Sequence, residues 1–356
     1  MPAGVTPFTY QAAPMRVVFG RGTLAAVGEE MARLGRSRAL VLSTPPQQAS
    51  AEDLAGSLGD KAAGVFAEAT MHTPTDVTAR ALEVLEGSGA DVLIALGGGS
   101  TIGLGKALAT RTGLDQIVIP TTYAGSEMTS ILGETEGGRK TTRRDPSILP
   151  ETVIYDVELT LTLPPAMSAT SGLNAIAHAV EALYAQDRNP ITSLMAAEAI
   201  RALGTALPRI VAAPSDIAAR EQALYGAWLC GAALNAVGMA LHHKLCHTLG
   251  GTFDLPHAET HAVVLPHATA FNAGAVPELL APITDALGGA TPGRALHALA
   301  KEVGAPIALR DLGMPEDGID RAAEIATENP YWNPRAVDRE AIRALIAAAW
   351  AGDTPS

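Results

Sequence analysis

The fold of this chain is decided by residues 91–101, which read DVLIALGGGST. The run from Val92 to Leu96 is continuously apolar, as in a parallel strand buried on both faces. A glycine turn follows at once and opens a helical segment that continues through Ala109. Glycines let a backbone close on an anion while the N–H groups of the first helical turn point toward it, so the turn suits the pyrophosphate of a dinucleotide. Because the spacing differs from GxGxxG, a tight turn without a ligand is the alternative.

The same alternation extends outward from this stretch. Further apolar runs occur at residues 38–43, 116–120 and 152–156, and alanine-rich helical stretches separate them. Near-continuous apolar strands that alternate with helices are typical of a parallel sheet covered on both faces. The first part of the chain is therefore predicted to be α/β.

The pattern changes after Pro164-Pro165. From there to Ala351, alanine, leucine and glutamate recur at three- and four-residue intervals, which predicts helices. A proline pair is also a natural boundary between two elements. We therefore expect an α/β nucleotide-binding domain with a parallel sheet over residues 1–163 and an all-α catalytic domain over residues 164–356.

The composition bounds the function. The chain has 356 residues, is 47% hydrophobic and 17% charged, and carries a net charge of -12. Nucleic acid and anionic lipid both need a cationic surface, so we expect neither as a partner. Only two cysteines occur, the N-terminus lacks a basic region followed by an apolar stretch, and no uncharged run of about 18 apolar residues is present. These features predict a soluble cytoplasmic protein that acts on a small molecule.

A second hydroxyl-rich turn follows the next apolar run. Residues 120–127 read PTTYAGSE, and an ordinary polar loop is the alternative to a binding site. Two such turns at the ends of successive strands are what a dinucleotide crossing an open α/β sheet requires. At the end of the first apolar run, two hydroxyls replace the acidic residue that would repel a 2′-phosphate, so the sequence allows NADH or NADPH. The predicted cofactor-binding residues are Ser43, Thr44, Gly97, Gly98, Gly99, Ser100, Thr121, Thr122, Ser126 and Thr129.

Histidines gather in the second half of the chain. Asn174 and His178 are four residues apart, as are His243 and His247, so each pair shares one face of a helix. Clustered imidazoles at this spacing indicate a metal site or a proton-transfer site. For any single histidine, a structural role with hydrogen bonds is the alternative. A divalent cation favours a carboxylate ligand, whereas position 174 holds a neutral amide.

These motifs resemble the iron-containing alcohol dehydrogenase superfamily, which has the dehydroquinate synthase-like fold. Its pattern includes a GGGS turn, a threonine-rich loop ending in Ser-Glu, an Asp-x-x-x-His pair, and a His-x-x-x-His pair before a Pro-His. The resemblance places the metal ligands of the family on Asn174, His178, His243 and His257. This chain departs from the pattern at Asn174 and at Gly103, where the alcohol dehydrogenases have aspartate.

The departures resemble one subgroup, the maleylacetate reductases. The matching segments are residues 97–106, 171–178, 242–247 and 329–335, which read GGGSTIGLGK, SGLNAIAH, HHKLCH and NPYWNPR. The resemblance implies a homodimeric oxidoreductase that uses NADH or NADPH to reduce the conjugated C=C bond of maleylacetate to 3-oxoadipate, in the degradation of aromatic compounds. It also implies reductive loss of halide from 2-chloromaleylacetate and a cofactor contact at Lys140.

The chemistry of that reaction assigns roles to the predicted ligand positions. Hydride added to the β carbon leaves an enolate, which hydrogen bonds and an imidazolium can stabilise without a Lewis acid, so no metal is expected. His243 and His178 are the predicted enolate stabilisers or acids, Asn174 is a neutral donor, and His257 completes the former ligand ring. By analogy with the family, His247 lies beside the nicotinamide.

The substrate is a dianion, which needs a local positive charge in an acidic chain. Residues 139–144 read RKTTRR and gather four cations. Arginine suits bidentate binding of a carboxylate, and a solvated surface run is the alternative. The predicted substrate-binding residues are Tyr123, Arg143, Arg144, His242 and Lys244.

Three other functions stay open at this point. A metal-dependent alcohol dehydrogenase on the same fold would need a cation held by three histidines or by Asn174. A lyase such as dehydroquinate synthase meets the same objection at Asn174. A non-catalytic nucleotide-binding protein would leave the histidine cluster unexplained.

Overall fold

A computed structural model of the chain describes residues 7–137, 139–329 and 331–356. Two compact units divide it. An α/β unit comprises residues 14–163 and 215–224, and a helical unit comprises residues 164–214 and 225–356 with the segment that precedes Pro14. The division differs from a single boundary at Pro164 in two places. The segment before Pro14 groups with the helical unit, and residues 215–224 group with the α/β unit.

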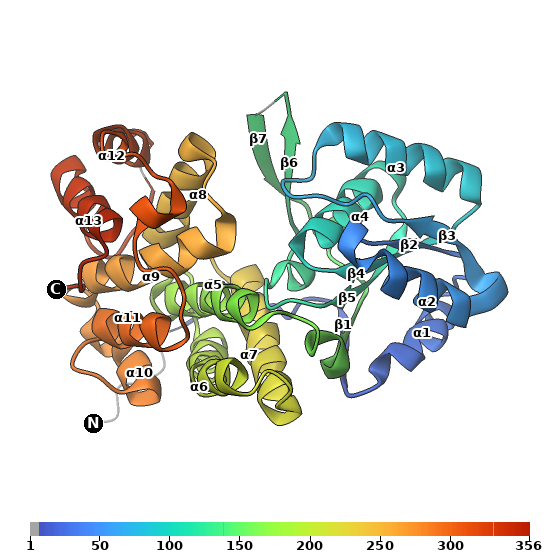
Figure 1. Ribbon diagram of the computed structural model, residues 1–356, viewed down its shortest axis with the longest axis horizontal. Helices are drawn as coiled ribbons and strands as arrows, with labels where there is room; N and C mark the ends of the chain where they lie inside the picture. The colour runs from blue at the N-terminus through green and yellow to red at the C-terminus, as the bar shows by residue number, and fades with distance from the viewer. Residues whose placement is uncertain (1–6, 138, 330) are drawn as a thin grey trace. The chain divides into compact units, whose positions relative to one another are not determined.

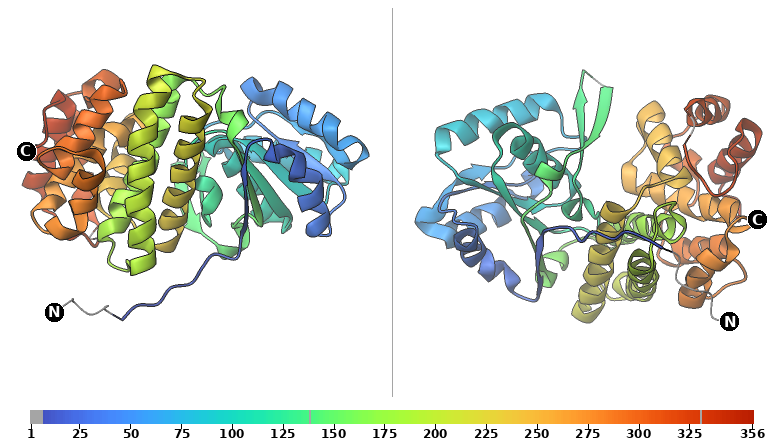
Figure 2. Two further views of the ribbon diagram at one scale, coloured as in Figure 1. Left: turned by 90° about the horizontal axis from the view of Figure 1, so that it is seen from below. Right: turned by 180° about the vertical axis from the view of Figure 1, so that it is seen from behind.

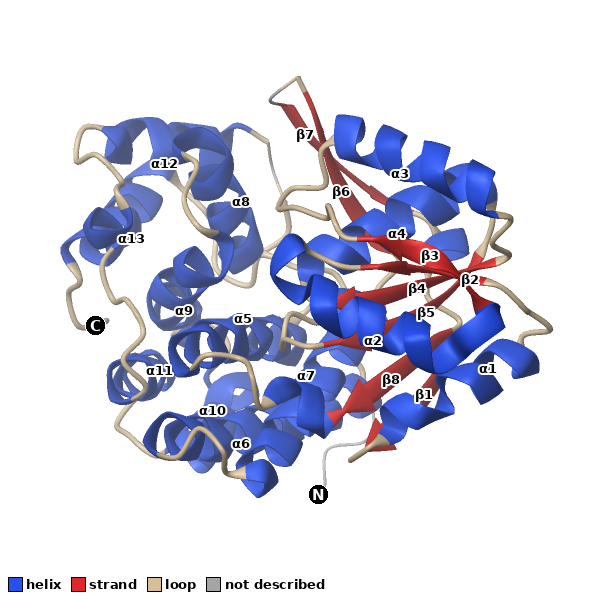
Figure 3. Ribbon diagram, turned by 45° about the vertical axis from the view of Figure 1, so that its right-hand side comes forward, coloured by secondary structure: helices blue, strands red, loops and turns tan. Residues whose placement is uncertain are grey.

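The α/β unit is built on a six-stranded sheet, which confirms the predicted fold class (Figures 1 and 3). Its strands are, in spatial order, β1 (Arg16–Gly20), β8 (Thr152–Asp156), β5 (Asp115–Pro120), β4 (Val92–Gly97), β2 (Ala39–Leu42) and β3 (Ala62–Phe66). All neighbouring strands run parallel. The central strands are almost entirely buried, whereas the edge strands β1 and β3 are mostly half-buried.

Helices cover both faces of this sheet, because successive side chains of a strand point to opposite faces (Figure 3). The helices are α1 (Val27–Arg33), α2 (Gln48–Leu58), α3 (Thr75–Ser88) and α4 (Gly99–Thr112). On one face, α1 and α2 pack against Val41 and Ile94. On the other face, α3 and α4 pack against Leu40 and Leu93. The alternation within β2 and β4 thus fixes which face each helix covers.

Two further strands form an antiparallel hairpin, β6 (Ile131–Glu136) and β7 (Arg139–Arg144), in which Leu132 pairs with Arg143. The cationic run at residues 139–144 is therefore a strand of this hairpin. Short 3-10 turns connect many of the elements: η1 (Thr23–Ala26), η2 (Pro45–Gln47), η3 (Gly59–Lys61), η4 (Ser126–Met128), η5 (Pro146–Ile148), η6 (Val157–Thr160) and η7 (Leu309–Leu312).

The helical unit is arranged around one long helix, α5 (Pro165–Tyr184), which is buried continuously from Ser168 to Tyr184. The other helices are α6 (Pro190–Ala212), α7 (Ile217–Ala236), α8 (Leu241–Phe253), α9 (His257–Ala273), α10 (Pro277–Leu287), α11 (Pro292–Glu302), α12 (Gly318–Glu328) and α13 (Arg339–Ala351). The first turns of α7 lie in residues grouped with the α/β unit. Figures 1 and 2 show α5 beside α6 and α9.

The sequence explains two features of this packing. Asn189 begins α6 with a capping box, in which its side chain accepts from Thr192 N and the Thr192 hydroxyl accepts from Asn189 N. Gly172 lets α5 approach α6 closely, because a Cβ there would lie 2.5 Å from Leu207 Cδ2. The close approach leaves the opposite side of α5 for polar residues that face α8 and α9.

In the part of the chain that the structure describes, no single helix is long and apolar enough to cross a membrane. Helices α7 and α8 meet the length and composition criterion only together, and they are bent by 96° at the break between them.

Candidate functional site

The glycine turn lies at the carboxyl end of β4, between the ends of β5 and β2. Gly97 has a φ of 153°, a conformation that disfavours other residues. A Cβ at Gly98 would lie 2.9 Å from Thr122 Cγ2, whereas a Cβ at Gly99 would meet nothing within 4 Å. No side chain caps the start of α4 at Gly98, so the first N–H groups of this helix are available to an anion.

Hydroxyls from α4 and from the ends of β2 and β5 lie at this edge of the sheet. Ser43 Oγ, Thr101 Oγ1 and Thr122 Oγ1 are buried without a hydrogen-bond partner among the described residues. Thr121 N donates to Gly97 O, and the Thr121 hydroxyl accepts from Gln47 Nε2 at 2.9 Å. The structure therefore brings the predicted residues of the three strand ends to one edge of the sheet, with Ser100 half-buried in α4 and Thr44 half-buried before η2.

Lys106 is a residue that sequence reasoning missed. It is fully buried in α4, and its Nζ donates to Ser126 O at 2.6 Å, Thr129 Oγ1 at 3.0 Å and Ile131 O at 3.0 Å. The hydroxyls of Ser126 and Thr129, both predicted to bind the cofactor, are thus hydrogen-bonded to this ammonium group. Burial lowers the pKa of Lys106 to about 7, while the charge of Glu127 acts in the opposite direction. The surrounding oxygen acceptors favour the charged form, so Lys106 anchors the loop after β5.

The other predicted residues of the α/β unit are Tyr123, Lys140, Arg143 and Arg144. Tyr123 is fully buried, and its hydroxyl accepts from Arg220 Nη1 at 3.4 Å. Arg143 and Arg144 are exposed on β7, where Arg143 Nη2 donates to Glu134 Oε2 at 2.9 Å. Lys140 belongs to the same strand, and its side chain lies outside what the structure describes.

The histidine cluster is built by three helices of the helical unit. Asn174, His178 and Glu181 lie on one face of α5 at four- and three-residue spacing. The predicted residues His242, His243, Lys244 and His247 come from α8, and His257 begins α9. Asn174, His178, His242 and His243 are buried, Lys244 is half-buried, and His247 and His257 are exposed.

The imidazole rings contact one another directly. His178 stacks on His243 with ring centroids 5.1 Å apart, and His247 lies 6.1 Å from His243. His261, which sequence reasoning missed, is fully buried at the centre of the cluster, with ring centroids 5.1 Å from His243 and 4.3 Å from His257. Its spacing of four residues from His257 on α9 is the signal that would have found it.

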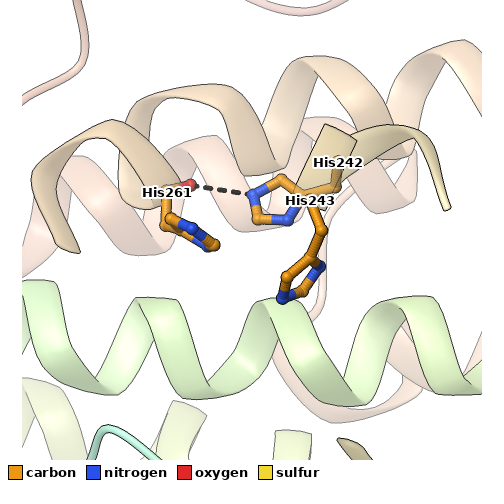
Figure 4. Close-up of side chains that lie close together, drawn as sticks. All are labelled: His242, His243 and His261. Carbon is orange, nitrogen blue, oxygen red and sulfur yellow. Dashed lines mark hydrogen bonds between the residues drawn. The ribbon is translucent and has the colours of Figure 1, made fainter. Parts of the chain in front are cut away.

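Hydrogen bonds fix the tautomers of two rings. His242 Nε2 lies 3.2 Å from His261 O (Figure 4), so this nitrogen carries the proton and Nδ1 is bare. His243 Nδ1 lies 2.6 Å from Glu181 Oε2, a carboxylate oxygen that accepts. The opposite nitrogen, His243 Nε2, is buried without a partner among the described residues, as are His178 Nδ1, Asn174 Oδ1 and both ring nitrogens of His261.

Burial favours the neutral form of the imidazoles in this cluster. Burial lowers the pKa of His178, His243 and His261 well below the usual range, and the neighbouring imidazoles lower it further. Burial likewise lowers the pKa of His242 to about 4, against the opposing charge of Glu181. Rings this close cannot all be charged, so a proton taken up by one ring disfavours protonation of the others.

The geometry and sequence match a known family. A model described as iron-containing alcohol dehydrogenase matches residues 14–157, and one described as the C-terminal part of the Fe-containing alcohol dehydrogenase family matches residues 168–350. The chain belongs to the iron-containing alcohol dehydrogenase family. This confirms the resemblance on which the sequence analysis relied.

Among individual members of this family, the chain is highly similar to maleylacetate reductases. A maleylacetate reductase of Rhizobium sp. (strain MTP-10005) is 60% identical over 349 residues, which cover 98% of this chain and 99% of that protein. The crystal structure of maleylacetate reductase from Agrobacterium tumefaciens is 61% identical, has a TM-score of 0.96, and covers 98% of this chain and 100% of its own. A 1,3-propanediol oxidoreductase structure is 28% identical with a TM-score of 0.90, covering 97% of this chain and 100% of its own.

The residues placed at the ligand positions of the iron-containing alcohol dehydrogenases offer a cation imidazoles and one neutral amide. Asn174 supplies that amide in place of the carboxylate that a divalent cation favours, and His178 and His243 stack at an interplanar angle of 29°. Among the described residues, His242, His243 and His261 form a group that could hold a metal ion. One possible ligand atom from each of these side chains lies within 4.8 Å of the other two. A cation in this chain would therefore be held by these three imidazoles.

We expect Gly99→Ala to separate nucleotide binding from folding. A methyl group at residue 99 meets no protein atom within 4 Å, so the melting temperature should stay unchanged or rise slightly. The methyl group would instead occupy the approach to the first N–H groups of α4, and we expect it to raise the dissociation constant of NADH about tenfold, or about 1.4 kcal/mol.

Gly87→Ala is the matched control, because Gly87 is also helical and a methyl group added there would also meet nothing within 4 Å. Gly87 lies at the end of α3, which leads to the amino end of β4. The glycine turn lies at the carboxyl end of that strand, so Gly87→Ala should not change NADH binding. NADH fluorescence titration of both variants measures the difference. Equal dissociation constants would contradict a pyrophosphate at this turn.

Lys106→Met tests the anchoring of the loop after β5. The substitution keeps the length of the side chain and leaves several buried oxygen acceptors without a donor, so the free energy of unfolding should fall by about 3–5 kcal/mol. Lys61→Met, at an exposed lysine in η3, should change it by less than about 0.5 kcal/mol. Urea unfolding measures both, and a Lys106→Met protein as stable as Lys61→Met would show that the loop holds without the ammonium group.

Proposed function

We propose that the chain reduces the conjugated C=C bond of maleylacetate to 3-oxoadipate with hydride from NADH or NADPH. Membership of the iron-containing alcohol dehydrogenase family and the 60% identical maleylacetate reductase support an NAD(P)H-dependent oxidoreductase. The observation that carries the proposal is the group of buried imidazole nitrogens without partners beside Asn174. Polar atoms left unpaired in a core need a ligand, and a polar substrate supplies one.

The reaction suits neutral, closely spaced imidazoles. Hydride adds to the carbon β to the ketone, the C=C electron pair shifts toward the carbonyl, and the negative charge develops on the ketone oxygen. The substrate brings two carboxylates, whose charge raises the pKa of an imidazole that they approach. One ring then carries a proton that stabilises the enolate oxygen, and the enolate carbon α to the ketone takes up a proton to complete the reduction.

The proposed roles follow the positions of the rings. His243 and His178 stabilise the enolate or act as acids, because they stack together and each presents an unpaired nitrogen. Asn174 is the neutral polar neighbour on α5. His257 completes the group at the exposed start of α9, and His247 lies on the exposed side of α8, where we propose that it meets the nicotinamide.

For the substrate carboxylates, Lys244 has the strongest support among the proposed binding residues. It follows His243 on α8, and its Nζ lies 5.9 Å from the centroid of the Tyr331 ring, whose hydroxyl is buried without a partner among the described residues. His242 adds its bare Nδ1. Arg143, Arg144 and Tyr123 stay predictions as substrate-binding residues.

Several finer points are part of the same proposal. Residues 1–163 bind the nucleotide and residues 164–356 carry the catalytic groups. Ser43 and Thr44, with Lys140, contact the cofactor, and hydroxyls at the end of β2 accept NADPH as well as NADH. A homodimeric assembly, a cytoplasmic location and dechlorination of 2-chloromaleylacetate also stay predictions, which light scattering, cell fractionation and chloride release respectively would test.

A metal-dependent alcohol dehydrogenase is the second candidate function. The observation that favours it is the group of His242, His243 and His261, in which hydrogen bonds leave lone pairs on at least two rings. Two points weigh against it, namely the amide at position 174 and the similarity to maleylacetate reductases at 60% identity.

We expect maleylacetate reduction to continue in the presence of a chelator, because the proposed mechanism uses protons in place of a Lewis acid. The measurement is NADH oxidation with fresh maleylacetate before and after dialysis against EDTA, together with metal analysis of the protein. Loss of activity that one divalent ion restores would contradict the metal-free mechanism and favour the second candidate.

His243→Ala tests the central imidazole. If this ring stabilises the enolate, its loss should lower kcat about a hundredfold or more, the scale for one transition-state donor, with little change in NADH affinity. His267→Ala is the control, because His267 is also a buried histidine, in α9, but it is absent from the ring contacts of the described cluster. His267→Ala should act through the melting temperature. A folded His243→Ala protein with near-normal kcat would refute the assignment.

A further inference from the structure

One carboxylate touches the histidine cluster, and the sequence analysis gave it no role. Glu181 lies on α5 with a fully buried side chain. Its Oε1 accepts from His242 N at 2.7 Å and from the Tyr184 hydroxyl at 3.2 Å. Its Oε2 accepts from Ala240 N at 3.0 Å and faces His243 Nδ1 at 2.6 Å. The donors are two backbone amides, a phenol and an imidazole.

This arrangement identifies Glu181 as an ionised, accepting group. A protonated carboxyl would need one acceptor for its own O–H, and the groups around it are donors. Two of them are the N–H groups of Ala240 and His242 at the start of α8, where the positive end of the helix dipole stabilises a negative charge. Glu181 therefore fixes the beginning of α8, the helix that carries His242 and His243.

The same carboxylate determines which nitrogen of His243 faces the site. Because Oε2 accepts, Nδ1 carries the proton, and Nε2 points away from Glu181. Nε2 is buried and has no partner among the described residues, and the ring stacks on His178. Without Glu181, either tautomer and more than one ring orientation would be available to His243.

We propose that Glu181 is a positioning residue of the reaction, holding the His243 ring and its Nδ1–H tautomer so that Nε2 is the atom presented to the substrate. The proposal rests on the proposed function for its kinetic consequences, whereas its structural part, the tautomer of His243, can be measured without any turnover. Replacing a group that orients a metal-bound imidazole typically costs about 10- to 100-fold in activity, and we expect the same scale here.

Glu181→Gln is the first test. The amide keeps the shape of the side chain but offers an NH₂ group in place of one oxygen, so a donor can face Nδ1 or one of the backbone N–H groups. We expect kcat for maleylacetate to fall about 10- to 100-fold, with the dissociation constant of NADH unchanged. Tyr184→Phe is the matched control, because it removes another hydrogen bond to Glu181 and leaves the bond to His243 intact, so kcat should stay within about threefold of the original.

A double-variant cycle separates positioning from general destabilisation. If Glu181 acts through His243, then the protein with Glu181→Gln and His243→Ala should turn over no more slowly than His243→Ala alone. A structural role would instead add its own loss to that of His243→Ala. Additive losses, or a folded Glu181→Gln protein with unchanged kcat, would overturn the proposal.

The tautomer itself provides a readout that does not depend on activity. In the original protein labelled with ¹⁵N-histidine, the His243 resonances, assigned by their disappearance in His243→Ala, should report a protonated Nδ1 and a bare Nε2. The opposite tautomer would overturn the proposal even if maleylacetate is reduced. The expected tautomer in a protein that does not reduce maleylacetate would uphold the positioning geometry and refute the proposed function.

Discussion

The helical unit depends on one constraint, that polar atoms taken out of water need hydrogen-bond partners. The helical unit buries His178, His242, His243 and His261 together, and burial keeps their imidazoles neutral. Only some of their nitrogens have partners within the described chain. Leaving a buried donor or acceptor unpaired costs about 1–3 kcal/mol, so the cluster weakens the fold unless a ligand completes it. Residues that destabilise the fold locally without a compensating structural contact are typical of a functional site.

The α/β unit meets the same constraint with a different solution. Lys106 is a buried cation surrounded by oxygens of the loop after β5, and Glu127 is a buried carboxylate that accepts from the Tyr155 hydroxyl at 2.9 Å. Burial raises the pKa of Glu127 and lowers that of Lys106, so burial disfavours both charges, whereas hydrogen bonds and the charge of Lys106 lower the pKa of Glu127 and the charge of Glu127 raises that of Lys106. Around the glycine turn, the uncapped N–H groups at the start of α4 and the hydroxyls of Ser43, Thr101 and Thr122 are left for a ligand.

The sequence predicted those elements whose burial is complete. The apolar runs correspond to β2, β4, β5 and β8, which lie in the middle of the sheet. Strands β1 and β3 were missed because they lie at the edges, where half-exposed positions dilute the apolar pattern. Residues 139–144 were interpreted only as a cluster of cations, because the antiparallel partner that makes them a strand is a tertiary contact.

The site was predictable where spacing on one helix carries the information. His178 and His243 follow from such spacing, and His261 would have followed from His257 by the same rule. Glu181 and Lys106 could not be singled out, because a lone charged residue in a helix is usually solvated. What distinguishes them is the set of backbone groups around each, and only the fold brings those groups together.

The substitution at position 174 and the position of Glu181 together balance the charge of the cluster. Alcohol dehydrogenases of the family place an aspartate where this chain has Asn174, which would put a second carboxylate seven residues before Glu181 on the same helix. The negative charge of two carboxylates among neutral imidazoles would balance the charge of a divalent cation. The negative charge of one carboxylate would balance a single added proton on one ring. Because Glu181 already caps α8 and holds His243, the amide at 174 removes one charge without disturbing that framework. We infer that the amide at residue 174 favours a proton on one ring over a bound divalent cation.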